Sequence, residues 1–237
     1  MSIYEAIFNR CSVREYEMEK LAPGRLEALE RYLKNIALLD EEKTVKFEII
    51  DNSDGKQKIH GLWKVEAPYY LAIYCGNDQL SVRNAGYAAE QAVLYLTSKE
   101  LGTCYLGATK AGEEKKDGLK RFLVIAFGRA AGRPSRDSSL AHRASLAALC
   151  VFKDEPGEQV KAILRAARLA PSSFNSQPWR FVVYSDRIYI FAKKTLPFSG
   201  KEKHAFKEFN IGIMLSHIML AAEELWMNME TQVEDQF

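Results

Sequence analysis

A helix followed by a strand occurs twice in this chain at a constant spacing, and this repeat limits the folds that the sequence can adopt. Lys46 and Arg180 each open a strand rich in β-branched and aromatic residues, and they lie 134 residues apart. The apolar helix positions ahead of the strands keep the same separation, as Leu29 and Ile163 show. A constant offset across two elements argues for an internal duplication, against the alternative of a chance match between two helix–strand units.

A second pair of elements repeats later in each half. An Asn-x-Gly motif opens a long apolar helix at Asn84 and again at Asn210, 126 residues further on, so the second copy is shorter in its middle. The helices over 85–96 and 211–225 are apolar around much of their circumference, which favours packing of one against the other. The second helix is too short and too polar to span a bilayer, so no membrane association is predicted.

The predicted fold class is α+β, a three-layer α-β-α arrangement with a central mixed, mostly antiparallel sheet and helices on both faces. Residues 1–237 are expected to form one intertwined domain made of two half-repeats, about 1–150 and 151–237. The expected strands are Lys46–Asp51, Tyr69–Tyr74, Phe122–Phe127, Arg180–Tyr184 and Ile188–Ala192.

A polar loop separates the helix and the strand of the second copy. It runs from Ala170 to Arg180 and contains two prolines, which stop the helix and the strand ladder at its ends. Hydroxyl and amide side chains in between offer donors and acceptors for a ligand. An ordinary surface loop is the alternative interpretation. The loop residues in question are Pro171, Ser172, Ser173, Asn175, Gln177 and Pro178.

Cationic and glycine-rich segments in the first half add to this pattern. Arg10, Ser12 and Arg14 occupy alternate positions, so an extended backbone would point all three toward one phosphate group. Alone this signal is weak, because arginines near an N-terminus are usually just solvated. The segment 101–107 has two glycines that let the backbone approach a flat ligand, and 128–136 carries spaced arginines.

Taken together, these four motifs resemble those of the flavin-dependent nitroreductase superfamily, and within it a single-chain branch similar to the TM nitroreductases. The matching patterns are R-x-S-V-R from Arg10, L-G-T-C-Y-L-G from Leu101, G-R-x-x-G-R-P-x-R from Gly128 and A-P-S-S-x-N-x-Q-P-W-R-F from Ala170. In ordinary members the last motif follows the first within a few tens of residues. Here it lies in the second half of the chain.

The resemblance therefore implies a fused dimer. Family members are usually homodimers with the flavin at the subunit interface. The first half of this chain keeps the arginines and the glycine segment but has Asn35 to Thr44 in place of the ligand loop. The second half keeps the loop but has Trp226 to Met229 in place of the glycine segment. One flavin per chain is expected, and a monomer would suffice, with a weak homodimer left open.

The cofactors implied by the resemblance are FMN and NAD(P)H, the latter as electron donor. The arginines and Ser12 would hold the phosphate and ribityl chain, the glycine segment would lie near flavin N5, and the loop would cover the ring. Gln177 would either contact the flavin or brace the loop. No side chain is predicted to be catalytic, because flavin N5 carries the chemistry. The implied FMN-binding residues are Arg10, Cys11, Ser12, Arg14, Leu106, Gly107, Ala108, Arg133, Arg136, Pro171, Ser172, Ser173, Asn175 and Gln177.

The activity implied is that of an FMN-dependent NAD(P)H oxidoreductase, with ping-pong hydride transfer through flavin N5 to a nitroaromatic, a quinone or a similar small-molecule acceptor. The sequence chooses neither the acceptor nor between NADH and NADPH. Two alternatives stay open: a protein that stores or senses FMN with little turnover, and an interaction scaffold that binds no flavin.

Composition, charge and cysteine spacing argue against a nucleic-acid-binding protein and against a metal site. A formal net charge of +2 and the lack of a cationic stripe predict no nucleic-acid partner. The four cysteines are scattered without metal-ligand spacing and no apolar segment opens the chain, so no metal site is predicted and a cytoplasmic location is expected. His217, on an apolar helix, is predicted to be a core residue with its hydrogen bonds satisfied.

Overall fold

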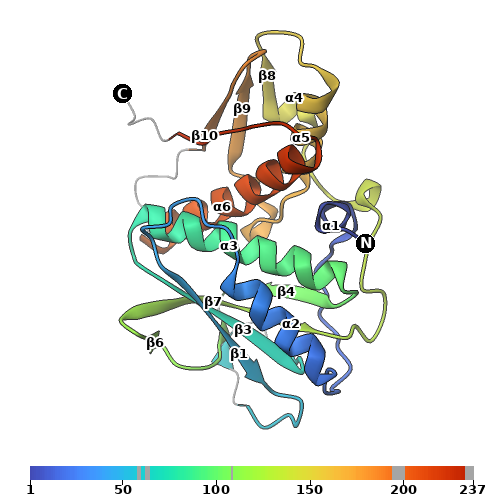
Figure 1. Cartoon of the computed structure of the whole chain (residues 1–237), viewed down its shortest axis with the longest axis vertical. Coiled ribbons are helices and arrows are strands. Elements are labelled where there is room, and N and C mark those ends of the chain that lie inside the picture. The colour runs from blue at the N-terminus through green and yellow to red at the C-terminus, as the bar shows by residue number, and fades with distance from the viewer. Residues whose placement is uncertain (58–59, 62–64, 108, 194–200, 233–237) are drawn as a thin grey trace.

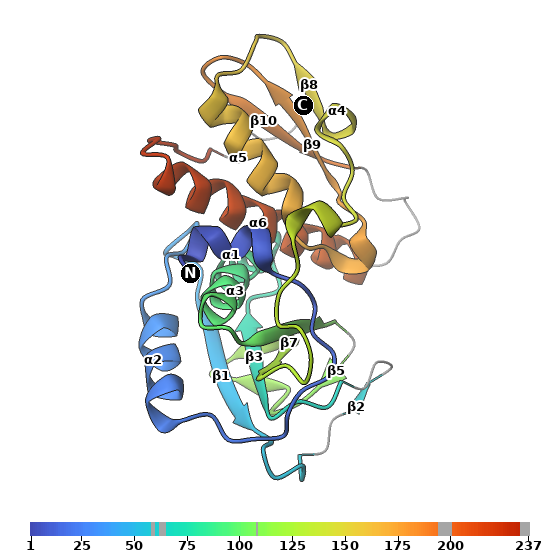
Figure 2. The same cartoon turned by 90° about the vertical axis from the view of Figure 1, so that its right-hand side faces the viewer.

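The structure of the protein is a computed structural model, and it describes residues 1–57, 60–61, 65–107, 109–193 and 201–232. Two β-sheets lie on opposite sides of a layer of helices (Figure 1). The view turned by 90° shows the same order of layers (Figure 2). The centre of the molecule is therefore helical, and the two sheets flank it.

The larger sheet belongs to the first half of the chain and is antiparallel throughout. Its central strand, β3, is buried along its whole length, because the sheet is covered on both faces. The strand order is β1 (Val45–Asp51), β3 (Tyr69–Cys75), β7 (Leu119–Gly128) and β4 (Gly102–Leu106), and β6 (Lys115–Lys116) pairs with β7.

The smaller sheet belongs to the second half. It has the order β10 (Ile188–Ala192), β9 (Trp179–Val183) and β8 (Cys150–Phe152). β8 and β9 are parallel, and helix α5 (Glu158–Leu169) forms the crossover that a parallel pair requires. β9 and β10 are antiparallel, so this sheet is mixed.

The helical layer is built around α3 (Gln79–Ser98) and α6 (Lys201–Glu224), which cross each other at the centre of the molecule (Figure 1). Asp78 caps the N-terminus of α3 by accepting a hydrogen bond from the Ser81 N–H. The remaining elements are α1 (Ile3–Asn9), α2 (Pro23–Lys34), α4 (Leu146–Leu149), the 3₁₀ turns η1 (Ser138–Leu140) and η2 (Ser173–Asn175), and the short pair β2 (His60–Gly61) and β5 (Thr109–Lys110).

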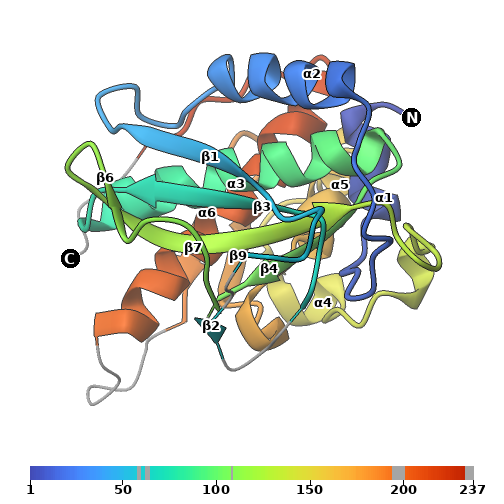
Figure 3. The same cartoon turned by 90° about the horizontal axis from the view of Figure 1, so that it is seen from below.

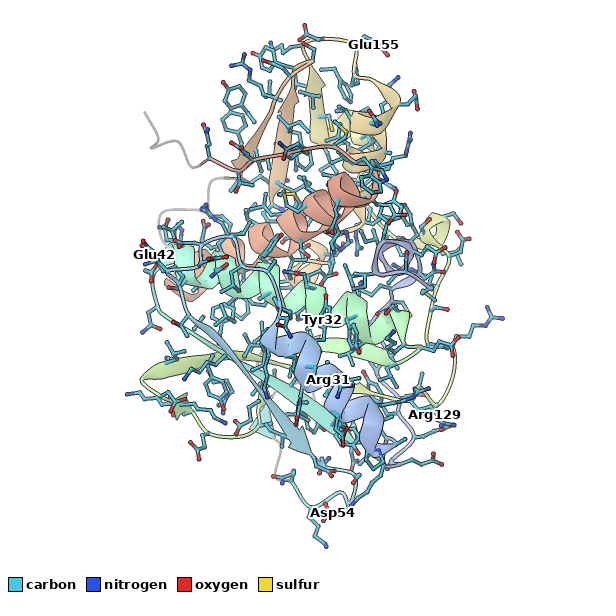
Figure 4. All side chains as sticks on the ribbon, viewed as in Figure 1. Arg31, Tyr32, Glu42, Asp54, Arg129 and Glu155 are labelled. Carbon is cyan, nitrogen blue, oxygen red and sulfur yellow. The ribbon has the colours of Figure 1, made fainter. Side chains whose placement is uncertain are left out.

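Helix α2 lies on the β1 side of the larger sheet, next to α3 (Figure 3). Tyr32 on α2, labelled in Figure 4, stacks on Tyr95 of α3 with ring centroids 4.1 Å apart. Burial raises the pKa of the Tyr32 hydroxyl to about 12. The aromatic contact fixes α2 against the helical layer.

No helix in the described part of the chain is long and apolar enough to cross a membrane.

The α+β class predicted from the sequence is confirmed, and each of the five expected strands is present. The expected single central sheet is not observed, because the strands divide between two sheets, one in each half. Helices do not cover both faces of the larger sheet either. Its second face packs against chain segments around Val13, Ala67 and Ala130. The reason is that α3 and α6 bury almost their whole circumference and so occupy the middle layer.

Candidate functional site

The N-terminal segment that follows α1 runs between two other predicted motifs. On one side, the Arg136 N–H donates to the Asn9 carbonyl, with an N–O distance of 2.7 Å. On the other side, the Val13 N–H donates to the Thr103 carbonyl of β4 at 2.9 Å. A glycine is required at 102, because a Cβ there would lie 2.8 Å from the Val13 side chain. The arginine motif, the arginine tail and the glycine segment thus meet.

Three guanidinium groups gather at this junction. Arg10 is only 5% exposed, and within the described residues its side chain has no hydrogen-bond partner. The Nε of Arg136 is also buried without a partner. Burial, followed by the charges of Arg10 and Arg136, lowers the pKa of Arg143 to about 10. Within the part of the chain described, none of the three forms an ion pair with a carboxylate. The Arg143 guanidinium donates instead to backbone carbonyls and to Asn175 Oδ1, so Arg10 and Arg136 are the members of the cluster that are suited to bind an anion.

Other predicted phosphate residues are more open to solvent. Ser12, Arg14 and Arg133 are exposed. Cys11 is half-buried, and its Sγ lies 3.7 Å from the Pro134 carbonyl oxygen. Burial raises the pKa of the Cys104 thiol on β4, and the charges of Arg14 and Arg10 oppose this rise.

The glycine segment ends beside helix α6. Leu106, the last residue of β4, is buried, whereas Gly107 is exposed. A Cβ at Gly107 would lie 3.4 Å from Cε1 of Phe206 on α6. Ala108 lies outside the described residues.

The polar loop after α5 has an unusual backbone. Phe174, Asn175 and Gln177 have φ values of 53°, 53° and 42°, in the left-handed region that favours glycine. Each such residue costs roughly 1 kcal/mol or more unless its surroundings compensate. A loop that keeps three of them within four positions must be held firmly by its neighbours.

Hydrogen bonds from the segment ahead of α4 supply that support. Arg143 Nη1 donates to Asn175 Oδ1 at 2.9 Å, and Asn175 Nδ2 donates to the His142 carbonyl at 2.9 Å. The Ala144 N–H donates to Gln177 Oε1 at 2.8 Å. The Gln177 side chain therefore braces the loop against residue 144. Arg143 connects the loop of the second half to the arginine cluster of the first.

Helix α6 brings the loop and the glycine segment together. The Ser173 N–H donates to Asn210 Oδ1 at 3.1 Å. Asn210 lies four residues after Phe206, the residue next to Gly107, so the two are neighbours on one helix face, about 6 Å apart along the axis. The segment of the first half and the loop of the second therefore meet over the same stretch of α6.

A buried polar network lies beneath the cluster. His217 Nε2 is 2.9 Å from Glu90 Oε1, and Tyr105 donates its hydroxyl to Glu90 Oε2 at 2.6 Å. His217 Nδ1 is 2.9 Å from the Ala166 carbonyl, which can only accept, so Nδ1 carries a proton. The prediction of a satisfied core histidine is confirmed. The charge of Glu90 also raises the pKa of Arg143, which opposes the larger lowering caused by burial.

Three of these residues were not predicted from the sequence. Arg143 lies in an irregular A-H-R-A-S segment with no periodicity to mark it. Glu90 is a single acidic residue in a largely apolar helix, and its spacing does not show which residues it contacts. Asn210 carried a signal, its match to Asn84 in the repeat, but the match did not indicate which segment it would bind.

Two cavities, of about 370 and 500 Å³, lie near the N-terminus, α2 and the end of α3, and the larger one adjoins the arginine tail, because Arg129, Pro134 and Ser135 line it. None of the predicted FMN-binding residues lines them. The convergence of charge and strained backbone is a stronger sign of function than cavity volume, so the arginine cluster and the loop are the candidate site.

Comparison with solved structures defines the class. A Thermotoga maritima protein described as a putative nitroreductase matches with a TM-score of 0.71 and 21% identity, over 100% of this chain and 91% of its own. A nitroreductase family protein of Clostridium difficile 630 matches with a TM-score of 0.54 and 14% identity, over 65% of this chain and 100% of its own. The protein has the nitroreductase fold.

The family follows from the sequence itself. The family model described as "Putative TM nitroreductase" matches residues 2–222. This chain therefore belongs to the TM nitroreductase family, as its motifs predicted. A comparison with curated proteins gives no match.

Proposed function

We propose that this protein is an FMN-dependent NAD(P)H oxidoreductase with one FMN site per chain, composed from both halves. The observation that carries the proposal is the arginine cluster, in which no guanidinium group pairs with a carboxylate of the described residues, joined to the strained loop by Arg143. A phosphate is the ligand that fits such donors best, because guanidinium binds it in a bidentate manner. Thr103 Oγ1 is buried beside the same segment and has no hydrogen-bond partner among the described residues, so we propose that it also hydrogen-bonds the phosphate.

The residues present fit FMN as follows. Arg10 and Arg136, with Ser12, Arg14 and Arg133 at the rim, would bind the phosphate and ribityl chain. The backbone of Leu106 and Gly107 would face the ring, and Pro171, Ser172 and Ser173 would cover it from the other half. Asn175 and Gln177 would act mainly by holding the loop, because their amide groups are already bonded to residues 142–144.

An internal duplication would explain why the site is composite. Asn84 Oδ1 accepts a hydrogen bond from the Leu39 N–H at 2.8 Å, just as Asn210 Oδ1 accepts from Ser173. The two acceptors lie 126 residues apart and the two donors 134 residues apart, which are the two repeat offsets. Each asparagine thus binds the helix–strand loop of its own half. Only the loop held by Asn210 has the ligand sequence, which supports a single site.

When bound, FMN would supply the redox chemistry, accepting a hydride from NAD(P)H and passing two electrons to an acceptor such as a quinone or a nitroaromatic. With a quinone, NAD(P)H and one proton yield NAD(P)⁺ and the hydroquinone. The protein would orient the ring, bind the phosphate and limit water. All four cysteines are free thiols, in keeping with the proposed cytoplasmic location, and a monomer would contain the complete site.

Steady-state turnover tests this proposal. The purified chain, loaded with FMN, would be assayed for NADH and NADPH oxidation with menadione and with a nitroaromatic acceptor. Oxidation that depends on both FMN and acceptor is expected. Bound FMN without turnover would instead indicate a storage or sensor protein, and a chain that binds no FMN would contradict the proposal as a whole.

A further inference from the structure

Phe174 stands out on the loop because its side chain packs against almost nothing. It is 97% exposed, although it is a large apolar residue in a segment that is otherwise tightly hydrogen-bonded. Its backbone is left-handed, with a φ of 53°, which a phenylalanine adopts only at a cost. Neither packing nor backbone preference explains a phenylalanine here, since a glycine would satisfy both.

The hydrogen bonds of the loop nevertheless fix the backbone at this position. The residue before it, Ser173, is bonded to Asn210 of α6, and the residue after it, Asn175, is bonded to Arg143. The Gln177 N–H donates to Ser172 Oγ at 2.9 Å, closing the loop on itself. An exposed aromatic ring on a fixed backbone offers a face on which another flat apolar group can stack.

The position of Phe174 points to the ligand. Asn210, which holds its neighbour, lies one helical turn from Phe206, and Phe206 lies beside Gly107 of the proposed flavin segment. The backbone that carries the ring therefore lies next to the candidate site and not on a distant surface. A ligand there would approach the flavin and Phe174 together.

We propose that Phe174 is a specificity-determining residue that stacks on flat aromatic electron acceptors, such as quinones and nitroaromatics. This inference rests on the proposed function and deepens it. Stacking against an aromatic ring favours aromatic over non-aromatic acceptors and requires no new hydrogen bond. Phe174 would not take part in hydride transfer or in holding FMN.

Trp226 offers a matched control. It is also 97% exposed and also left-handed, with a φ of 54°, but it follows the C-terminal end of α6 and lies outside the candidate site. Glycine is the right replacement at both positions, because it accepts a positive φ without strain and so keeps the fold intact. Phe174→Tyr keeps the ring and should restore the behaviour of the original protein.

The experiment measures KM and kcat of the FMN-loaded variants with menadione and with ferricyanide, together with the Kd for FMN. Phe174→Gly is expected to raise the KM for menadione about tenfold. Its ferricyanide kinetics and FMN Kd should stay unchanged, and Trp226→Gly should match the unmodified chain throughout.

Three results would overturn the inference. An unchanged menadione KM in Phe174→Gly would show that the ring serves another purpose, such as docking a protein. An equal loss with ferricyanide would assign it to flavin positioning. An equal effect of Trp226→Gly would mark the change as non-specific. A wild-type chain that binds no FMN would remove the proposed function first, and this inference with it.

Discussion

Gly86 of α3 and Gly212 of α6 make reciprocal contacts at the crossing of the two central helices. A Cβ at Gly86 would overlap the Phe209 carbonyl oxygen, and a Cβ at Gly212 would overlap the Arg83 carbonyl oxygen. Phe209 and Arg83 lie 126 residues apart, as the two glycines do. Such an exchange of equivalent contacts is typical of a two-fold interface, which supports our proposal that the chain is a fused dimer.

The two glycines should be equally intolerant of a side chain. Gly86→Ala and Gly212→Ala are each expected to lower the free energy of unfolding by about 1 to 3 kcal/mol, because the helix backbones must move apart. Urea denaturation would measure this. Gly24→Ala on α2 is the control, since nothing lies within 4 Å of its Cβ position and alanine favours a helix. Wild-type stability in Gly86→Ala would contradict the close crossing.

The paired asparagines should differ in function despite their similar geometry. Asn210→Ala releases the ligand loop and is expected to weaken FMN binding about tenfold, measured by flavin fluorescence titration. Asn84→Ala removes hydrogen bonds to Leu39, Asp40 and Lys43 and should cost about 1 to 3 kcal/mol of stability, but it should leave the FMN Kd unchanged. Equal effects on FMN binding would argue against a single site.

Replacing the buried Arg10 should weaken FMN binding more than replacing an exposed arginine. Arg10→Ala is expected to raise the FMN Kd by roughly 10- to 100-fold, since a charge-assisted phosphate contact is worth about 1.5 to 3 kcal/mol. Arg14→Ala should have a smaller effect, because Arg14 is exposed. The control is Arg31→Ala, an exposed residue on α2 labelled in Figure 4. An unchanged Kd in Arg10→Ala would place the phosphate elsewhere.

The N-cap of α3 should make stability depend on acid pH. Hydrogen bonds from Ser81 lower the pKa of Asp78 to about 2, from an ordinary value of 3.8. The folded state therefore gains stability from the carboxylate above about pH 4, and this gain is lost as the pH falls from about 4 to 2. Asp78→Ala should cost about 1 kcal/mol at pH 7 in urea denaturation, and the difference should shrink over that range.

Asp78→Asn separates the cap from the charge. Asparagine is also a good N-cap residue, so this variant should lose little stability at pH 7. A difference between Asp78→Ala and the original chain that stays constant from pH 5 to pH 2 would show that the carboxylate charge contributes nothing.

Local patterns in the sequence were sufficient to predict the helices, the strands and the motifs. Helix α5 ends at Leu169 as its periodicity predicted, and β10 has the predicted bounds. The packing of α3 on α6 also followed from the apolar character of both helices. In these cases the signal lies in neighbouring residues, which share one element.

The division into two sheets could not be predicted in the same way. Strand patterns show that a segment is extended and buried, but not which strand it pairs with. The role of Arg143 was hidden for a similar reason. Its partner Asn175 lies 32 residues away, and its neighbours Arg10 and Arg136 belong to other segments, so only the fold brings them together.

The central claim, one composite FMN site per chain, is tested most directly by stoichiometry. The absorption spectrum of the purified protein, with FMN added if necessary and the excess removed, gives the ratio of flavin to chain. One FMN per chain, bound by a monomer, is expected. Two per chain would mean that both halves hold complete sites, and none would contradict the assignment of the arginine cluster to a flavin phosphate.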